Sequence, residues 1–198
     1  MKRITLILTA VLVGFAMASC QDQSLKKEDI MKATNAFFEQ GEQEIQTISS
    51  GEEFMAFYHA FNERKTQFVE ELFADHMDEE GNLKGYSEEE AEDIYNSIYE
   101  RATAYNRTEA VKAAEFIAPA VDNLEATVNV LYEQFQAGIP FVPEDIEAFA
   151  NAVVPYTIFE EYDNVLPELR ERIFAISDKI TEMDAALSAR IKELYGEE

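Results

Sequence analysis

Apolar residues recur every three or four positions along nearly the whole chain after residue 25, which is the period of an amphipathic helix. The first such segment runs from about Leu25 to Ile48, with a stripe of Ile30, Ala33, Phe37, Gly41, Ile45 and Ile48. The second ends near Met77 and has as inward positions Phe54, Phe57, Tyr58, Phe61, Phe68, Leu72 and Phe73. No alternating run is long enough for a sheet, so the pattern predicts an all-α protein.

Two capping boxes mark where helices begin. Ser50 is followed three residues later by Glu53, and Ser87 by Glu90, which places a hydroxyl at each N-cap and a carboxylate that can return to it. The second box opens a helix whose apolar positions are Ala91, Ile94, Tyr95, Ile98, Ala102 and Tyr105. Residues 106–108 are a candidate break, after which Thr108 would cap the next helix.

Prolines and a glycine divide the second half of the chain. The apolar stripe continues through Val111, Ala114, Ile117, Val121, Leu124, Val128, Leu131 and Phe135. Gly138 is a plausible C-terminal stop for this segment, and Pro119 inside it should kink or split it. Pro143, Pro155 and Pro167 are expected to begin helices, because proline suits the first turn.

The last predicted helix is the most regular. Its seam alternates by three and four and comprises Leu166, Leu169, Ile173, Ile176, Ile180, Met183 and Leu187, continued approximately by Ile191 and Leu194. A helix of this length spans about 40 Å. We favour a strut within an antiparallel bundle, and the alternative is a self-association seam.

Together the segments predict an antiparallel bundle of five to seven helices with a long C-terminal helix. We expect one domain over residues 25–198, although a boundary near residues 138–143 would give two helical halves. The loop at that boundary is apolar, so it either tucks into the bundle or forms a contact surface.

The first twenty residues have the layout of a secretory signal peptide. Lys2 and Arg3 precede an apolar run from Ile4 to Phe15, which is shorter than the ~20 residues of a membrane span. The following Met17-Ala18-Ser19-Cys20 resembles a bacterial lipobox, except that Met17 stands where leucine is usual. The resemblance implies that residues 1–19 are cleaved, that Cys20 carries lipid, and that residues 20–24 form a short tether.

Such an anchor implies a protein of the bacterial cell envelope, with the outer membrane favoured and the periplasmic or surface face left open. Its partner there is the membrane, through the lipid on Cys20.

Composition narrows the possible partners. The 198 residues include 40 acidic and 16 basic side chains, for a net charge of −24, and loss of Lys2 and Arg3 with the leader makes it more negative by two. This charge argues against a nucleic-acid partner, which would require clustered cations. The single Cys excludes an internal disulfide, while 47% hydrophobic residues can build a core.

The two histidines are the main candidates for metal chemistry. His59 has Glu63 one turn on, and His76 lies at the end of the second predicted helix, where a cation suits the helix dipole. Neither belongs to a Glu-x-x-His or His-Glu-x-x-His motif, nor to the Gly-x-His-x-x-Glu that an imelysin-like lipoprotein would require. We therefore predict no metal ligands.

The stretch from Asp75 to Glu90 is acidic and contains Gly81, which makes it a candidate calcium-binding loop. Aligning Gly81 with the invariant glycine of an EF-hand puts His76 at the first ligand position and Ser87 at the last, where a bidentate Glu belongs. A solvated turn between two capped helices is the better interpretation.

Catalytic motifs are missing from the sequence as well. It contains no Gly-x-Ser-x-Gly elbow and no glycine-rich phosphate loop, so we predict no catalytic residue, no cofactor and no enzyme activity. Six tyrosines are candidates for a ligand groove or for the rim of an aromatic core: Tyr95, Tyr99, Tyr105, Tyr132, Tyr156 and Tyr162.

These observations predict a lipid-anchored, non-catalytic helical-bundle module that binds a protein with a basic face or a small ligand, with a monomer favoured. One alternative is a calcium- or zinc-binding envelope protein or hydrolase that uses His59 and His76. Another is a structural homo-oligomer that assembles through the seam from Leu166 to Leu194.

Overall fold

The computed structural model of the chain describes residues 26–74, 76–78 and 82–196. These residues form five helices and contain no strand. The helices are α1 (Lys27–Gln46), α2 (Gly51–Phe73), α3 (Glu88–Gln136), α4 (Pro143–Thr157) and α5 (Pro167–Tyr195). The predicted all-α class and helix number are confirmed. The leader, Cys20, the tether and Leu25 lie outside the described residues, as do Asp75 and residues 79–81.

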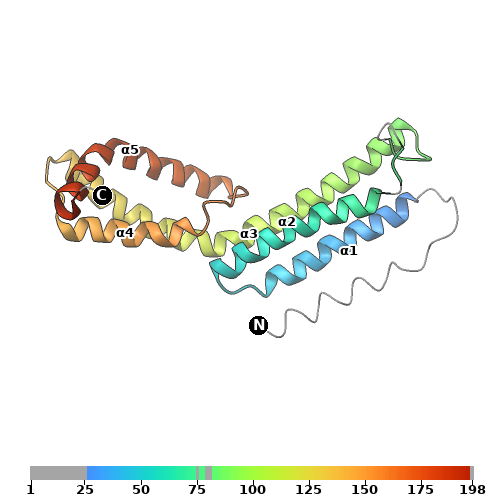
Figure 1. Cartoon of the computed structure of the whole chain (residues 1–198), viewed down its shortest axis with the longest axis horizontal. Helices are drawn as coiled ribbons and strands as arrows, with labels where there is room; N and C mark the ends of the chain where they lie inside the picture. The colour runs from blue at the N-terminus through green and yellow to red at the C-terminus, as the bar shows by residue number, and fades with distance from the viewer. Residues whose placement is uncertain (1–25, 75, 79–81, 197–198) are drawn as a thin grey trace.

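Helix α3 extends through the whole molecule and is shared by two three-helix bundles (Figure 1). Its 49 residues correspond to about 74 Å. Helices α1 and α2 pack along its first part, which we call the N-terminal bundle, and α4 and α5 pack along its second part, the C-terminal bundle. The loop at residues 138–143, the alternative domain boundary, instead joins α3 to α4 inside the C-terminal bundle.

The predicted break at residues 106–108 is wrong, because the helix continues through them. Thr108 does not cap a helix; its Oγ1 donates a hydrogen bond of 3.4 Å to the Ala104 carbonyl within α3. Tyr105 and Glu109 on either side are buried. The packing of these neighbours outweighs the free-energy cost of placing Asn and Thr in a helix. Relative to alanine this cost is a few tenths of a kcal/mol, up to about 0.7, per residue.

Pro119 also fails to split α3, although an interior proline removes one backbone hydrogen bond and costs about 3 kcal/mol. Ile117, Ala120 and Val121 around it are buried in the core, so packing holds both sides of the proline in helical conformation. Figure 1 shows that α3 changes direction between its two bundles, which agrees with the expected kink.

The predicted helix starts are mostly confirmed. Ser50 and Ser87 each accept a hydrogen bond from the backbone three residues on, and the box at Ser87 is reciprocal. Pro143 and Pro167 are the first residues of α4 and α5. Pro155 begins no helix, because it lies in the last turn of α4. The buried Ala152 packs this end of α4 against the core.

Two helix ends differ in how closely they follow the prediction. Helix α3 ends as expected before Gly138, whose φ is 68°. In this conformation the Gly138 N–H donates to the Phe135 carbonyl, and the Ile139 N–H donates to the Gln134 carbonyl. These two bonds form a Schellman motif. Helix α2 ends at Phe73, one turn before the predicted end near Met77, and an isolated bridge pairs Met77 with Leu83.

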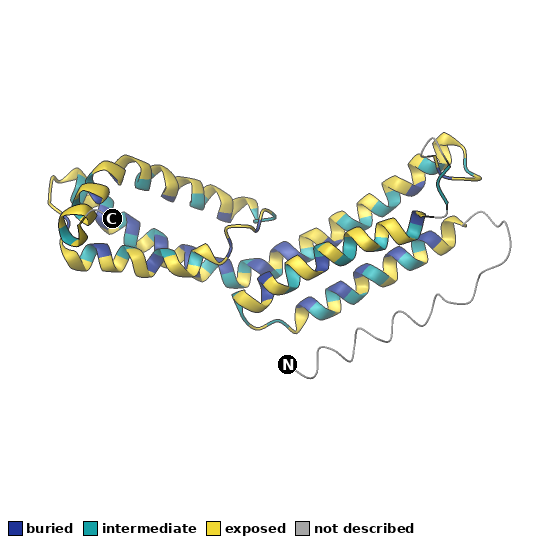
Figure 2. Cartoon of the chain, viewed as in Figure 1, coloured by how far each residue is buried: buried dark blue, intermediate teal, exposed yellow. Residues whose placement is uncertain are grey.

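Buried residues lie on the facing sides of the helices in both bundles (Figure 2). The seam of α5 belongs to the main core through Leu169, Ile176, Met183 and Leu187, so it packs within the chain and acts as a strut. The apolar loop before α4 also contributes to this core through Phe141, whereas Ile139 and Val142 are exposed.

The N-terminal bundle contains a cluster of aromatic rings that rests on a glycine. The Phe61 ring stacks between Phe37 and Tyr105, with centroid distances of 5.1 and 4.5 Å. A Cβ atom at Gly41 of α1 would lie 2.5 Å from Phe61 Cε2, so only glycine allows this approach.

Within the described residues, no helix is both long and apolar enough to cross a membrane.

Candidate functional site

The segment that joins α4 to α5, residues 158–166, crosses to the N-terminal bundle; we call it the connector. Phe159 at its start is 5% exposed and lies against Gly51, the first residue of α2. A Cβ atom at Gly51 would be 2.7 Å from Phe159 Cζ. Gly51 therefore permits the close approach of the connector to α2.

Tyr162 continues the contact between the connector and α2. Its ring packs edge-on against Phe54 and Tyr58, with centroid distances of 5.2 and 5.0 Å. The Tyr58 hydroxyl donates a hydrogen bond of 3.0 Å to Asp163 Oδ1. Burial, together with this bond and the Asp163 charge, raises the pKa of Tyr58 to about 12, so the phenol remains a hydrogen-bond donor at any physiological pH.

Glu109 on α3 lies beneath the connector and is 3% exposed. Asn164 of the connector donates from Nδ2 to the Asn106 carbonyl at 2.7 Å and, at the long distance of 3.5 Å, to Glu109 Oε1. The hydroxyls of Tyr105 and Tyr162 are buried without a hydrogen bond of standard geometry, although both are close enough to affect Glu109. Few groups therefore compensate this carboxyl.

The pKa of Glu109 is raised, because loss of solvent outweighs the opposing effects of Asn164 and of the charge on Lys65. Burial and the Glu109 charge also raise the pKa of the Tyr105 and Tyr162 hydroxyls. A carboxyl in this environment can exchange a proton, but its burial means that no substrate can reach it while the connector is in place. The cluster is therefore best understood as the contact that joins the two bundles.

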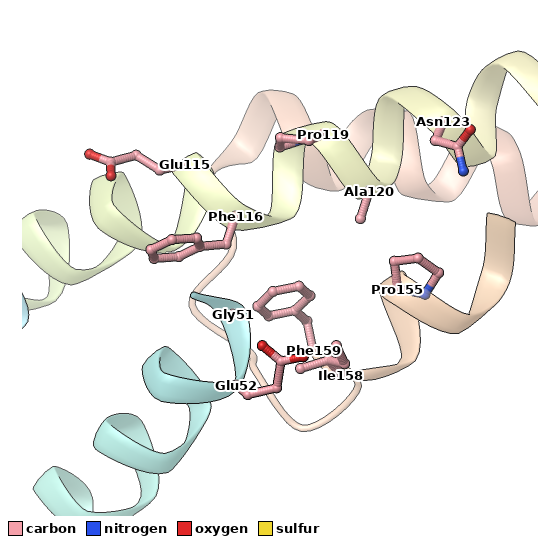
Figure 3. A pocket seen from close by; sticks show the side chains of 10 residues that line it. All are labelled: Gly51, Glu52, Glu115, Phe116, Pro119, Ala120, Asn123, Pro155, Ile158 and Phe159. Carbon is pink, nitrogen blue, oxygen red and sulfur yellow. The ribbon is translucent and has the colours of Figure 1, made fainter. Parts of the chain in front are cut away.

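An open pocket lies at the junction of the two bundles, and we call it the junction pocket (Figure 3). Its volume is about 400 Å³. The side chains come from the start of α2, the middle of α3, the end of α4 and the connector. They are Gly51, Glu52, Glu115, Phe116, Pro119, Ala120, Asn123, Pro155, Ile158 and Phe159.

The surface of the junction pocket is mostly apolar and its charged side chains are acidic. None of the ten lining residues is basic, and two are glutamates. Lys112 pairs with Glu115 at 2.6 Å, and Figure 3 shows the Glu115 side chain directed away from the pocket. Glu52 is exposed and directed toward Phe159, and no described side chain pairs with it. The pocket therefore combines an apolar floor with one uncompensated carboxylate.

A second hollow, of about 370 Å³, lies between the loop before α4 and the end of α5. Its charged residues are Arg190 and Glu193, which pair with each other at 2.7 Å. Because these charges compensate each other, this hollow has less to offer a charged partner than the junction pocket.

The two histidines do not come together with each other or with the junction pocket. His59 is half-exposed and its Nε2 lies 3.3 Å from Glu161 Oε2 of the connector. His76 follows the end of α2, and its carbonyl accepts a hydrogen bond from the Lys84 N–H. Glu63 is exposed on α2.

The acidic loop after α2 is described only in part. Asn82 donates to the Asp78 carboxylate from its backbone and from its side chain, at 2.7 and 3.2 Å, so Asn82 already engages both carboxylate oxygens. Among the described residues, no group of three or more His, Cys, Asp or Glu side chains could hold a metal ion.

The six tyrosines do not line one groove. Tyr105 and Tyr162 are buried beside Glu109, whereas Tyr99 is 72% exposed. The aromatic residues of the junction pocket are instead Phe116 and Phe159. Sequence analysis did not single these out, because neither belongs to a motif or to the apolar stripe of a predicted helix.

Comparison of the chain with protein-family models, with curated proteins and with solved structures found no match. The functional hypothesis therefore depends on the sequence and on the geometry of the junction pocket.

Proposed function

We propose that this chain is a lipid-anchored, non-catalytic binding module of the bacterial cell envelope. The lipobox-like sequence ending at Cys20 supports the anchor, and the net charge of −24 supports a partner that is not a nucleic acid. The observation that carries the binding role is the junction pocket, which presents apolar surface to solvent between the two bundles. Binding sites are typically concave and apolar with a few placed polar groups.

The arrangement of polar groups favours binding over catalysis. Among the residues that the structure describes, Glu109 is the one strongly buried carboxyl, and the connector covers it. Both histidines lie outside the junction pocket. A general base must come within hydrogen-bond reach of its substrate. In this structure Glu109 and both histidines lie outside the lining of the junction pocket, so none of them is placed to act on an occupant of the pocket.

The anchor is tested by expressing the full chain in a diderm bacterium with an alkyne-bearing palmitate analogue. We expect the chain to carry the label and to sediment with membranes, and the Cys20→Ala variant to lose both. Label that persists on Cys20→Ala would contradict the anchor.

The metal-dependent alternative has its own test. Elemental analysis of the purified chain should find no stoichiometric calcium or zinc. Bound metal that is lost in His59→Ala or His76→Ala would favour that alternative and contradict our proposal. The oligomer alternative is tested by sedimentation, where we expect a monomer because the centre of the α5 seam is buried within the chain.

A further inference from the structure

The apolar floor of the junction pocket continues onto an exposed face of α4. Ile158 lines the pocket and is 36% exposed, and Val154, one turn before it, is 64% exposed. Residues four apart lie on the same side of a helix. An occupant that extends from the pocket along α4 would also contact Val154, and burial of this surface would favour binding.

The openness of the pocket indicates what kind of occupant it suits. Sites for small ligands enclose most of the ligand surface, and their volumes are about 300–1,000 Å³. The junction pocket is at the lower end of this range and is open on one side, so a small molecule would keep much of its surface in water. A bulky side chain that projects from a larger partner needs only such an open recess, because the rest of the partner covers it.

The negative charge of the pocket and of the chain favours a basic partner among the larger molecules that could occupy the pocket. The carboxylate of Glu52 lies at the pocket with no described side chain paired to it, and no lining residue is basic. The net charge of −24 adds a field that attracts cations over longer distances. The same charge repels an anionic bilayer surface, so the membrane is disfavoured as the occupant.

We propose that the junction pocket binds an aromatic or large aliphatic side chain from a basic segment of a partner protein, with a Lys or Arg of that segment meeting Glu52. This inference rests on the proposed binding function and names its site and the chemistry of its partner. Phe116, Phe159 and Ile158 form the apolar contact, and Glu52 supplies the charge.

The test uses three fluorescently labelled peptides and the full chain in detergent. The probe is Lys-Lys-Phe-Lys-Lys, and its controls are Lys-Lys-Ser-Lys-Lys and Glu-Glu-Phe-Glu-Glu. We expect anisotropy to detect binding of the probe by about 1 mM, weaker binding of the serine peptide, and no binding of the acidic one. Added salt should weaken probe binding because the charges are exposed. No binding of the probe, or equal binding of the serine peptide, would overturn the proposal.

Matched variants locate the site. Glu52→Gln and Glu168→Gln each remove one acid from the first turn of a helix, but only Glu52 lines the pocket. Ile158→Ser and Ile139→Ser each remove an exposed isoleucine, the second from the other hollow. We expect Glu52→Gln to weaken binding about two- to fivefold and Ile158→Ser about fivefold or more. Both controls should bind as the unaltered chain does.

The outcomes separate this inference from the proposed function. If the probe binds and neither Glu52→Gln nor Ile158→Ser weakens it, the junction pocket is the wrong site, although the chain still binds peptides. Weakening by Ile139→Ser alone would assign the second hollow. Loss of palmitate labelling at Cys20 concerns only the anchor, and its result does not depend on these variants.

Discussion

The Tyr58 hydroxyl donates a hydrogen bond of 3.0 Å to Asp163 Oδ1, and the two residues are 105 positions apart in the sequence. Tyr58 belongs to α2 in the N-terminal bundle, whereas Asp163 belongs to the connector of the C-terminal bundle. The same contact region contains the pair His59–Glu161 and the bond from Asn164 to the Asn106 carbonyl. Among the described helices, α1 and α2 make no direct contact with α4 or α5, so the connector joins the two bundles in addition to the shared α3.

We expect Tyr58→Phe to lower the free energy of unfolding by about 1 kcal/mol, since it removes one hydrogen bond and keeps the ring packing. The change should also increase hydrogen exchange in residues 158–166, because the connector loses a contact with α2. Urea denaturation and exchange measured by mass spectrometry test the two effects. Tyr99→Phe is the control, since Tyr99 is 72% exposed, and equal effects of both substitutions would contradict the prediction.

Gly41→Ala should destabilise the N-terminal bundle. In an exposed helix this change stabilises by about 1 kcal/mol, but here the new Cβ would lie 2.5 Å from Phe61 Cε2. The Phe61 ring is stacked between Phe37 and Tyr105 and cannot move freely. We expect a net loss of about 1–3 kcal/mol, measured by urea denaturation.

A double mutant provides the check on this steric reason. Phe61→Leu shortens the side chain that the new methyl group meets. Gly41→Ala combined with Phe61→Leu should therefore be less destabilised than the sum of the single variants. Additive effects would show that Phe61 is not the obstacle.

The helices were predictable because each has a local signal. The hydroxyl of Ser87 and the carboxylate of Glu90 are three residues apart, and the structure pairs them reciprocally. The errors occurred where distant packing overrides local preference. Pro119 and the Asn106–Thr108 segment suit helix ends, but the neighbouring Tyr105, Glu109 and Ile117 are buried on a helix that continues.

The candidate site was not predictable, because it is assembled from four segments. In the sequence Gly51 is recognisable only as part of a capping box. No residue near Gly51 indicates that Phe159 will lie against it. Glu109 is one of 40 acidic residues, and its burial depends on Tyr162 and Asn164 arriving from the connector. Contacts over such distances carry no periodic signal in a single sequence.

Arg64→Gln should weaken the contact between α1 and α2. Arg64 donates from both terminal nitrogens to the two Glu44 oxygens, at 3.2 and 2.6 Å. Burial alone would raise the pKa of Glu44, but the hydrogen bonds from Arg64 and Gln40 outweigh it and the pKa is lowered. We expect a loss of about 1 kcal/mol at neutral pH, measured by urea denaturation.

The pH dependence of this loss follows from the lowered pKa of Glu44. A carboxyl whose pKa is lower in the folded state stabilises above its unfolded pKa, and this contribution disappears as the pH falls through the folded value. The stability difference between the chain and its Arg64→Gln variant should therefore shrink in acid below about pH 4. A difference that stays constant down to pH 2 would mean that Arg64 acts through its contact with the Phe61 ring and not through Glu44.

Glu109→Gln should stabilise the protein at neutral and alkaline pH. The pKa of Glu109 is raised by its burial, so the folded state holds the proton more tightly than the unfolded chain. The contribution of such a group is fully present below the unfolded pKa and is lost as the pH rises through the folded value. Glutamine resembles the protonated carboxyl and avoids this loss, and its Oε1 still accepts from Asn164.

The measurement is the free energy of unfolding of both proteins at several pH values between 4 and 8. The advantage of Glu109→Gln should be small at the acid end and should grow as the pH rises, because only the ionised carboxyl is costly to bury. Glu100→Gln is the matched control, since Glu100 is exposed on the same helix and its variant should have the same stability as the unaltered chain at each pH. A Glu109→Gln variant that is less stable at pH 8 would show that the ionised carboxylate binds the connector, and the account of the cluster as an uncompensated buried acid would then be wrong.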